Sequence, residues 1–79
     1  MTNEEIAAAI RWHRENLGIK SQDVASKMFL SKSAYSNIEK GEKAITVVEL
    51  CKIASIFNMS LDELIRIPSR RNRQKRFEA

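Results

Sequence analysis

The sequence predicts an all-α fold, a compact five-helix bundle in a single domain. The 79 residues suffice for one folded domain and leave no room for a second. Apolar residues make up 43% of the chain and recur at helical spacing, which is ample for a helical core. Only two glycines and one proline are present, and β-hairpin signals are absent, so the turns that a β fold needs are missing.

The first helix is expected to begin at Thr2 or Asn3, either of which can cap it, and to run to about Leu17. Two glutamates in its first turn complement the positive end of the helix dipole. Gly18 follows as a C-cap, because glycine takes the left-handed conformation without steric cost. The inward stripe of this helix is predicted to be Ile6, Ile10, His13 and Leu17.

Residues 21–40 contain two short helical patterns separated by a tight break. In the first, residues 21–28, the small Ala25 lets two helix backbones approach closely. The second opens at Ser31, whose hydroxyl can cap a helix that begins at Lys32. A crossing pair of this kind, with its second helix presented outward, is the arrangement that lays a recognition helix in the major groove of DNA. The inward residues of the two patterns are Val24, Ala25, Met28, Ala34, Tyr35 and Ile38.

The outward face of the second pattern is short and polar. Ser33, Ser36, Asn37 and Lys40 recur there at i, i+3, i+4 and i+7. A solvated face is usually rich in Glu and Arg, whereas short hydroxyl and amide groups flanked by lysines suit close approach to base edges and phosphates. An ordinary exposed face is the alternative that these residues leave open.

Two further helices are expected after the central pair. Thr46 can cap the first of them, which ends at Asn58, and Ser60 with Glu63 forms a capping box that opens the second, which ends before Pro68. The apolar stripe of the fourth helix is Val47, Leu50, Cys51, Ile53, Ala54 and Phe57. The fifth helix is more apolar than packing on one core requires, so it is predicted to pair two copies of the chain. The residues concerned are Leu61, Leu64, Ile65 and Ile67.

No residue points to catalysis. His13 is the only histidine and has no Cys or second His at ligand spacing, which favours a packed position at the core edge over metal binding. Cys51 has no partner cysteine and falls among apolar residues, which favours a buried structural thiol. Trp12 is either a lid on the core edge or a contact for a partner. Paired carboxylates and a glycine-rich phosphate loop are also lacking, so we expect neither enzyme activity nor a cofactor.

Charge is distributed unevenly along the chain. Residues 1–68 contain as many acidic as basic side chains, whereas residues 69–79 supply the whole net charge of +4. We expect residues 1–68 to form the folded domain and the basic tail, residues 69–79, to be disordered. A basic arm favours nucleic acid through counterion release, although such tails also serve as plain solubilising ends. Neither a membrane span nor a signal pattern is found, so a cytoplasmic protein without a membrane partner is expected.

The motifs over residues 6–65 resemble those of the phage-repressor helix-turn-helix family, the Cro-like or XRE group. The similarity lies in IRWHRENLGI, QDVASKM, SKSAYSNIEKGEK, ELCKIASIF and NMSLDEL. It implies a lambda-repressor-like bundle in which helices 2 and 3 form the helix-turn-helix. It also implies a transcriptional regulator, here expected to be a repressor, that binds a pseudo-palindromic double-stranded DNA operator as a homodimer.

The resemblance further implies roles for individual residues. Lys32, Ser33 and Asn37 would contact bases, since an amide can pair with adenine and a lysine with guanine. A partly buried ion pair between Arg14 and Glu39 would orient the recognition helix. The residues expected beside phosphates are Lys20, Ser21, Gln22, Ser36, Lys40 and Lys43.

Two positions depart from the family's pattern. Ser21 stands where the family often has a phosphate-contacting glutamine, with Gln22 one position late. Either Ser21 caps a shortened helix, or Lys20 occupies a poor cap and offers its charge to a phosphate. Phe29 stands where the turn commonly has glycine, and a bulky residue at positive φ is strained. Its side chain then either projects outward or wedges between the helices.

A protein-interaction module of the same fold is the alternative function, because fold alone does not determine function. An antitoxin-like or adaptor protein would use Trp12, the C-terminal helix and the basic tail to bind another protein, such as a toxin or a polymerase subunit. The lysines clustered on the central pair and its flanks favour DNA instead. They are Lys20, Lys27, Lys32, Lys40 and Lys43.

Overall fold

The computed structural model describes residues 2–67, which form five helices and, within that range, no strand. The predicted all-α fold is confirmed. Residues 1 and 68–79, which include the predicted basic tail, lie outside the described residues. The helices are α1 (Asn3–Leu17), α2 (Ser21–Lys27), α3 (Lys32–Glu39), α4 (Val47–Ile56) and α5 (Leu61–Leu64).

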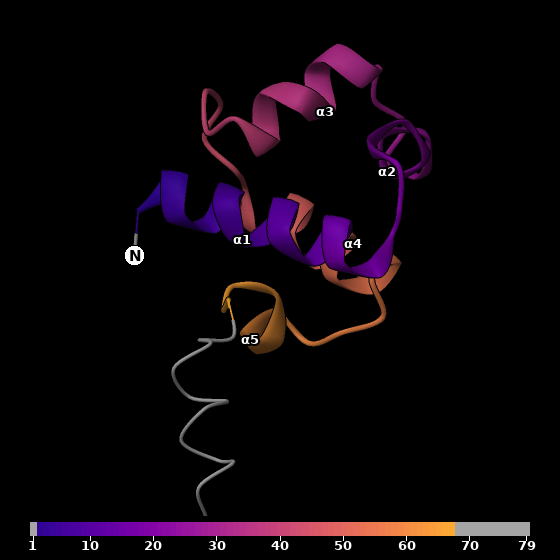
Figure 1. Ribbon diagram of the computed structural model, residues 1–79. Helices are drawn as coiled ribbons and strands as arrows, with labels where there is room; N and C mark the ends of the chain where they lie inside the picture. Colours follow the sequence, from indigo (N-terminus) through magenta and orange to yellow (C-terminus); the bar gives the residue numbers. More distant parts are fainter. Residues whose placement is uncertain (1, 68–79) are drawn as a thin grey trace, which may run out of the picture.

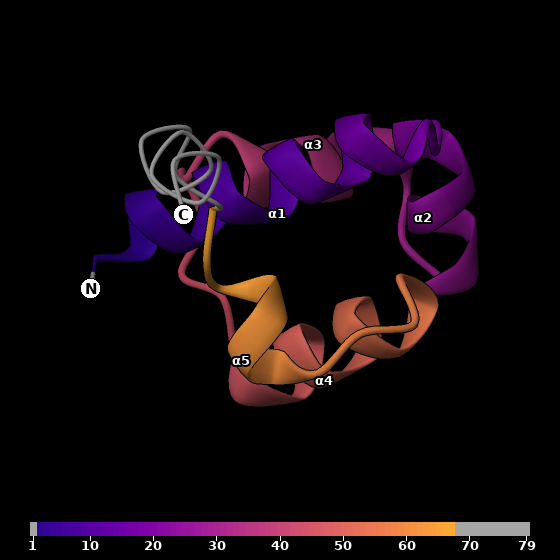
Figure 2. The same cartoon turned by 60° about the horizontal axis from the view of Figure 1, so that its bottom comes forward.

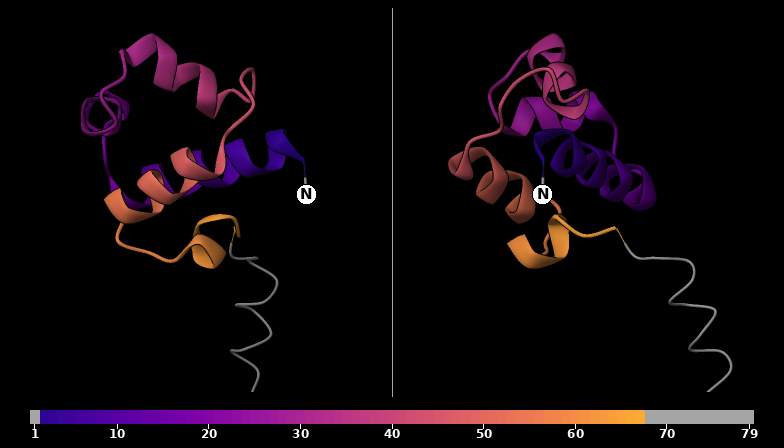
Figure 3. Two further views of the ribbon diagram at one scale, coloured as in Figure 1. Left: turned by 180° about the vertical axis from the view of Figure 1, so that it is seen from behind. Right: turned by 90° about the vertical axis from the view of Figure 1, so that its left-hand side faces the viewer.

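The helices are stacked so that α3 and α5 lie on opposite sides of the molecule. In Figure 1, α3 is at the top, α1 and α4 are in the middle and α5 is at the bottom. The same order appears in the views from behind and from the side (Figure 3). α2 packs on α3, and α1 packs on both α3 and α5. Seen from the α5 side, α1, α2, α4 and α5 form a ring around the core (Figure 2).

One cluster of buried side chains joins all five helices. Six of its large members have no exposed surface, which fixes the rotation of each helix about its own axis. For α3, Tyr35 and Ile38 are buried, and the opposite face of the helix is therefore turned outward. The large fully buried residues are Ile10, Val24, Tyr35, Ile38, Ile53 and Leu64.

The helix ends follow the local signals of the sequence. The Ser31 hydroxyl accepts a hydrogen bond from the Ala34 N–H at 3.1 Å and so caps α3. Gly18 ends α1 in the left-handed conformation, with φ 73°. The cap of α4 differs by one position, since Phe57 is the C-cap and Asn58 is the left-handed residue after it. Capping boxes begin three helices, α1 with Thr2 and Glu5, α4 with Thr46 and Glu49, and α5 with Ser60 and Glu63.

Three residues that were predicted to face the core are exposed instead, namely Leu17, Val47 and Cys51. Leu17 is the last residue of α1 and Val47 is the first residue of α4. Cys51 lies beside the buried stripe of α4, which is narrower than the run of apolar residues suggests. The prediction of a buried structural thiol is therefore wrong.

Candidate nucleic-acid interface

The outward face of α3 brings the predicted base-contacting residues together. Lys32, Ser33 and Asn37 are exposed, while Ser36 is half-buried between them and the neighbouring helices. These four side chains and Lys40 line one shallow hollow on the surface of α3. Hydroxyl, amide and ammonium groups thus converge there without a large side chain to hold a ligand away, an arrangement suited to base edges in the major groove.

A second hollow adjoins the first, because Ser36 and Lys40 line both. Its remaining wall comes from α1 and from the start of α2, where Ser21 is the first helical residue. Three of the residues predicted beside phosphates, Ser21, Ser36 and Lys40, therefore lie together next to the polar face of α3. The other residues that line this hollow are Arg11, Arg14 and Glu39.

The other predicted phosphate-contacting residues do not line these two hollows. Lys20 and Gln22 are exposed at the start of α2. Lys43 lies in the loop after α3, and its ammonium donates to the Glu49 carboxylate at 2.5 Å. Partial burial opposes ionisation of Glu49, but the hydrogen bonds from Lys43 and from Thr46 outweigh it and lower the pKa of this carboxyl.

The start of α2 agrees with one of the two alternatives for its cap. Lys20 occupies the N-cap position and its side chain makes no capping hydrogen bond. Ser21 is already helical, so it does not cap a shortened helix. The ammonium group of Lys20 consequently remains available to the surroundings of α2.

Phe29 projects into solvent from the turn between α2 and α3. Its φ angle is 59°, and 91% of its surface is exposed. The turn is closed beneath it by the N–H of Leu30, which donates to the Ala25 carbonyl oxygen at 2.9 Å. Of the two expectations for this side chain, the outward one is confirmed and the wedge between the helices is wrong.

The predicted ion pair between Arg14 and Glu39 is present and links α1 to the end of α3. The Arg14 Nε donates to Glu39 Oε2 at 2.6 Å, and Nη2 donates to Oε1 at 3.1 Å. Nη1 donates to the Ile19 carbonyl oxygen at 2.8 Å, and the Tyr35 hydroxyl donates to Glu39 Oε2. The hydrogen bond with Glu39 raises the pKa of Arg14, and burial together with the Glu39 hydrogen bond raises that of Tyr35. Arg14 therefore stays protonated and Tyr35 stays neutral, and their hydrogen bonds to Glu39 fix the end of α3.

Asn3 is a positioning residue that the sequence analysis treated only as a possible cap. Its Nδ2 donates to the carbonyl oxygens of Gly41 and Lys43 at 3.2 and 3.1 Å, and its Oδ1 accepts from the Ile45 N–H at 3.0 Å. Asn3 thus fastens the loop after α3 to the start of α1. Gly41 is required at this junction, because its φ is 77° and a Cβ there would lie 3.3 Å from the Glu4 Cγ. No local signal reveals these contacts, since they join residues about 40 positions apart.

The prediction that Leu64 belongs to a dimerisation surface is wrong. Its side chain has no exposed area, because α5 turns it into the core of its own protomer. Leu61 and Ile67 are exposed and Ile65 is half-buried, so these three residues remain on the surface.

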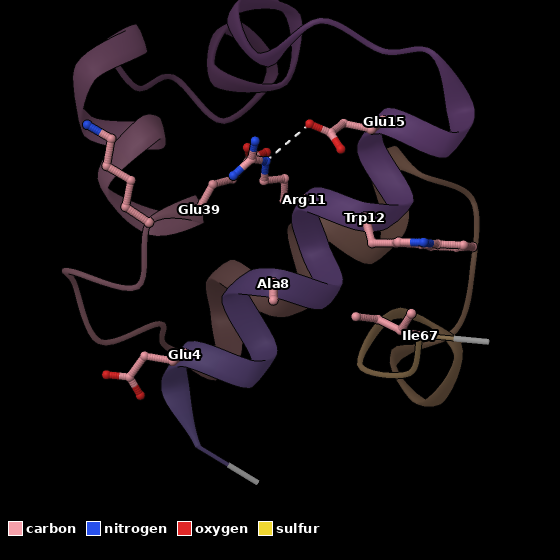
Figure 4. Close-up of a pocket in the computed structure, with 8 residues that line it drawn as sticks. Glu4, Ala8, Arg11, Trp12, Glu15, Glu39 and Ile67 are labelled. Carbon is pink, nitrogen blue, oxygen red and sulfur yellow. Dashed lines mark hydrogen bonds and ion pairs between the residues drawn. The ribbon is translucent and has the colours of Figure 1, made fainter. Parts of the chain in front are cut away.

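A third hollow lies between α1, the end of α3 and the residues after α5 (Figure 4). Trp12 and Ile67 form its apolar part, while Arg11, Glu15 and Glu39 are charged. The ring of Trp12 meets that of His13 edge to face, with centroids 5.0 Å apart. His13 is buried as expected, and its Nε2 lies 2.6 Å from the Arg66 carbonyl oxygen, so Nε2 carries the proton in this bond.

None of the helices among residues 2–67 has both the length and the apolar character of a membrane span. The same residues contain no group of three or more His, Cys, Asp or Glu side chains placed to hold a metal ion.

Comparison with known proteins connects this surface to a family. A helix-turn-helix family model matches residues 10–64, which includes α2, α3, α4 and α5 in full. Among solved structures, the clp gene regulator ClgR from C. glutamicum is similar, with a TM-score of 0.77 and 22% identity over 82% of this chain and 84% of that chain. At this identity the likeness shows a shared fold. A search of curated proteins gives no match.

Proposed function

The chain belongs to the Cro-like, XRE-type family of helix-turn-helix proteins, and from this premise we propose that it is a DNA-binding transcriptional regulator that reads the major groove with α3. The observation that supports the proposal most directly is the hollow on α3, where Lys32, Ser33 and Asn37 lie exposed beside Ser36 and Lys40. Groups that donate to bases and groups that suit phosphates are adjacent there, as a helix in the major groove requires.

Each side chain has a distinct part in the proposed complex. The Asn37 amide pairs with N6 and N7 of adenine, Lys32 donates to O6 or N7 of guanine, and Ser33 serves either base. Ser21, Ser36, Lys40 and the exposed residues Lys20, Gln22 and Lys43 position the helix through phosphates. The ion pair of Arg14 with Glu39 holds α3 at its angle to the groove, because it ties the end of that helix to α1.

We further propose that the protein acts as a homodimeric repressor. The exposed side chains of Leu61 and Ile67, with the half-buried Ile65, join two copies and place their recognition helices about 34 Å apart, one turn of duplex, on a pseudo-palindromic operator. The basic tail, residues 69–79, adds sequence-independent affinity along phosphates. A bound dimer would obstruct the polymerase at its promoter.

A protein-interaction role is the second candidate, and the third hollow favours it. Trp12 and Ile67 present apolar surface there, as a protein partner would need. Such an adaptor would tolerate replacement of Ser33 and Asn37, whereas a regulator that contacts bases would not.

The deciding experiment is fluorescence anisotropy with DNA from upstream of the protein's own gene and with an unrelated duplex, at several salt concentrations. Ser33→Ala and Asn37→Ala should lose the preference for the upstream DNA by about 1 to 3 kcal/mol while the salt dependence is retained. Ser55→Ala and Asn16→Ala, at exposed positions on α4 and α1, are the matched controls and should retain it. Equal binding to both duplexes by every variant would contradict base reading.

The dimer is tested separately by small-angle scattering on operator-length DNA. The mass should correspond to two copies of the chain per duplex. Replacement of Leu61 and Ile67 by glutamine, which leaves the core intact, should shift the mass to one copy. A wild-type mass of one copy per operator would overturn the dimer proposal.

A further inference from the structure

We infer that Arg11 is a further phosphate-binding residue of this interface and that Glu15 restrains it, an inference that rests on the proposed DNA-binding function. Arg11 lies on α1 and lines the second hollow together with Ser21, Ser36 and Lys40. Arg11 also lines the third hollow, so its side chain lies between the two hollows (Figure 4).

The charge balance of the second hollow favours an anion. Arg11, Arg14 and Lys40 supply three positive charges to its wall, and Glu39 supplies one negative charge. Arg14 holds that carboxylate with two hydrogen bonds, so the pair is neutral and partly buried. The charges that remain belong to Arg11 and Lys40, which line the same hollow as the hydroxyls of Ser21 and Ser36. A phosphate group needs this combination of cations and neutral donors.

The guanidinium of Arg11 has the donors for bidentate binding of a phosphate group. Its Nε donates to Glu15 Oε2 at 3.1 Å, and among residues 2–67 its terminal nitrogens make no hydrogen bond. The side chain is 63% exposed, so little desolvation opposes contact with DNA. A planar fork with free terminal N–H groups binds two phosphate oxygens at once, which the ammonium of Lys40 cannot do.

Glu15 is the intramolecular competitor for Arg11. Its carboxylate lies 3.1 Å from Arg11 Nε and 3.9 Å from Arg14 Nη2, and it is more than half exposed. An exposed pair at i and i+4 is a weak interaction, so a phosphate can replace the carboxylate. A carboxylate left near a phosphate repels it, and removal of this charge should therefore strengthen DNA binding.

The chain offers a matched control at the other side of the molecule. Arg66 and Asp62 form the same kind of exposed i, i+4 pair, with Nη2 3.1 Å from Oδ1. This pair lies at α5, on the side opposite α3 in Figure 1. Changes at Arg66 and Asp62 alter the total charge as changes at Arg11 and Glu15 do, but far from α3.

The test measures DNA affinity of the full chain by anisotropy, on the upstream DNA and on an unrelated duplex, from low to moderate salt. Arg11→Gln should weaken binding to both duplexes by the same factor, several-fold at low salt, and lower the slope of log K against log salt by about 0.9. Glu15→Gln should strengthen binding to both. Arg66→Gln and Asp62→Asn should leave the slope unchanged, and circular dichroism should show all four variants folded.

The inference is overturned if Arg11→Gln behaves like Arg66→Gln, or if it changes the preference between duplexes while the slope stays constant. In that case Asn37→Ala would still lose the preference, and the proposed function would stand. If the wild type binds no duplex at all, both proposals fall together. Arg11→Lys separates charge from geometry, because it should retain the slope and lose part of the affinity.

Discussion

Replacement of Phe29 by glycine should stabilise the protein, although it removes a large apolar side chain. The backbone at Phe29 has φ 59°, a left-handed conformation in which the Cβ crowds the carbonyl oxygen. Burial normally outweighs such strain, but Phe29 is 91% exposed and contributes little packing. The change therefore removes strain without leaving a cavity.

The magnitude follows from two opposing terms. The left-handed conformation costs about 1 to 2 kcal/mol for a residue with a Cβ, and glycine avoids this cost. The greater entropy of glycine in the unfolded chain offsets about 0.4 to 1 kcal/mol of the resulting stabilisation. The difference between the mid-range values is a net stabilisation of about 0.8 kcal/mol at Phe29, and 1 kcal/mol raises Tm by roughly 4 to 8 °C in a domain of this size.

Thermal and urea denaturation followed by circular dichroism would measure this effect. Phe29→Ala is the control for loss of the ring, since it keeps the strained Cβ, and it should change stability by less than about 0.5 kcal/mol. Gly18→Ala measures the same strain in reverse. Gly18 has φ 73° and no atom within 4 Å of an added Cβ, so its expected destabilisation, about 0.5 to 1 kcal/mol, comes from the backbone alone.

A loss of stability in Phe29→Gly with an unchanged m-value would refute this reasoning. It would mean that the phenyl ring packs on the folded protein more than its exposure indicates. A gain shared equally by Phe29→Ala would also refute it, because the ring and not the backbone conformation would then be the cause.

Three further changes test other contacts of the described residues. Arg14→Met should destabilise the fold by about 2 to 3 kcal/mol in urea denaturation, because it leaves the partly buried Glu39 without its ion pair; a loss below about 1 kcal/mol would contradict this. Asn3→Ala should cost about 1 to 2 kcal/mol by breaking three hydrogen bonds to the loop after α3, and Asn3→Asp should not restore this stability, because a carboxylate oxygen in place of Nδ2 would face the carbonyl oxygens of Gly41 and Lys43. At pH values above the ordinary pKa of this carboxyl, 4.5, the lowered pKa of Glu49 stabilises the folded state, and this contribution is lost as pH falls through the lowered folded pKa. In urea denaturation between pH 3 and 6, the free energy of unfolding should fall less on acidification in Glu49→Gln than in the wild type. An equal pH dependence in the two proteins would refute this prediction.

The family resemblance and the helical periodicity of the sequence predicted different parts of the site. The sequence motifs placed Arg14 opposite Glu39, and the structure brings these two residues together across 25 positions. Periodicity alone marked Ser33 and Asn37 as one outward face, and the burial of Tyr35 and Ile38 turns that face to solvent. Arg11 and its hollow could not be predicted in this way, because the hollow forms from three separate segments.

The sequence by itself determined, to within one residue, where α1, α3, α4 and α5 begin. The contacts that decide this, such as Thr2 with Glu5 or Ser31 with the Ala34 N–H, join residues three positions apart and form as soon as the helix does. The tertiary structure decided which apolar side chains are covered. Leu64 is enclosed and Cys51 is exposed because burial depends on how α4 packs against α2 and α5 and how α5 packs against α1, and that packing is set by the whole core and not by neighbouring residues.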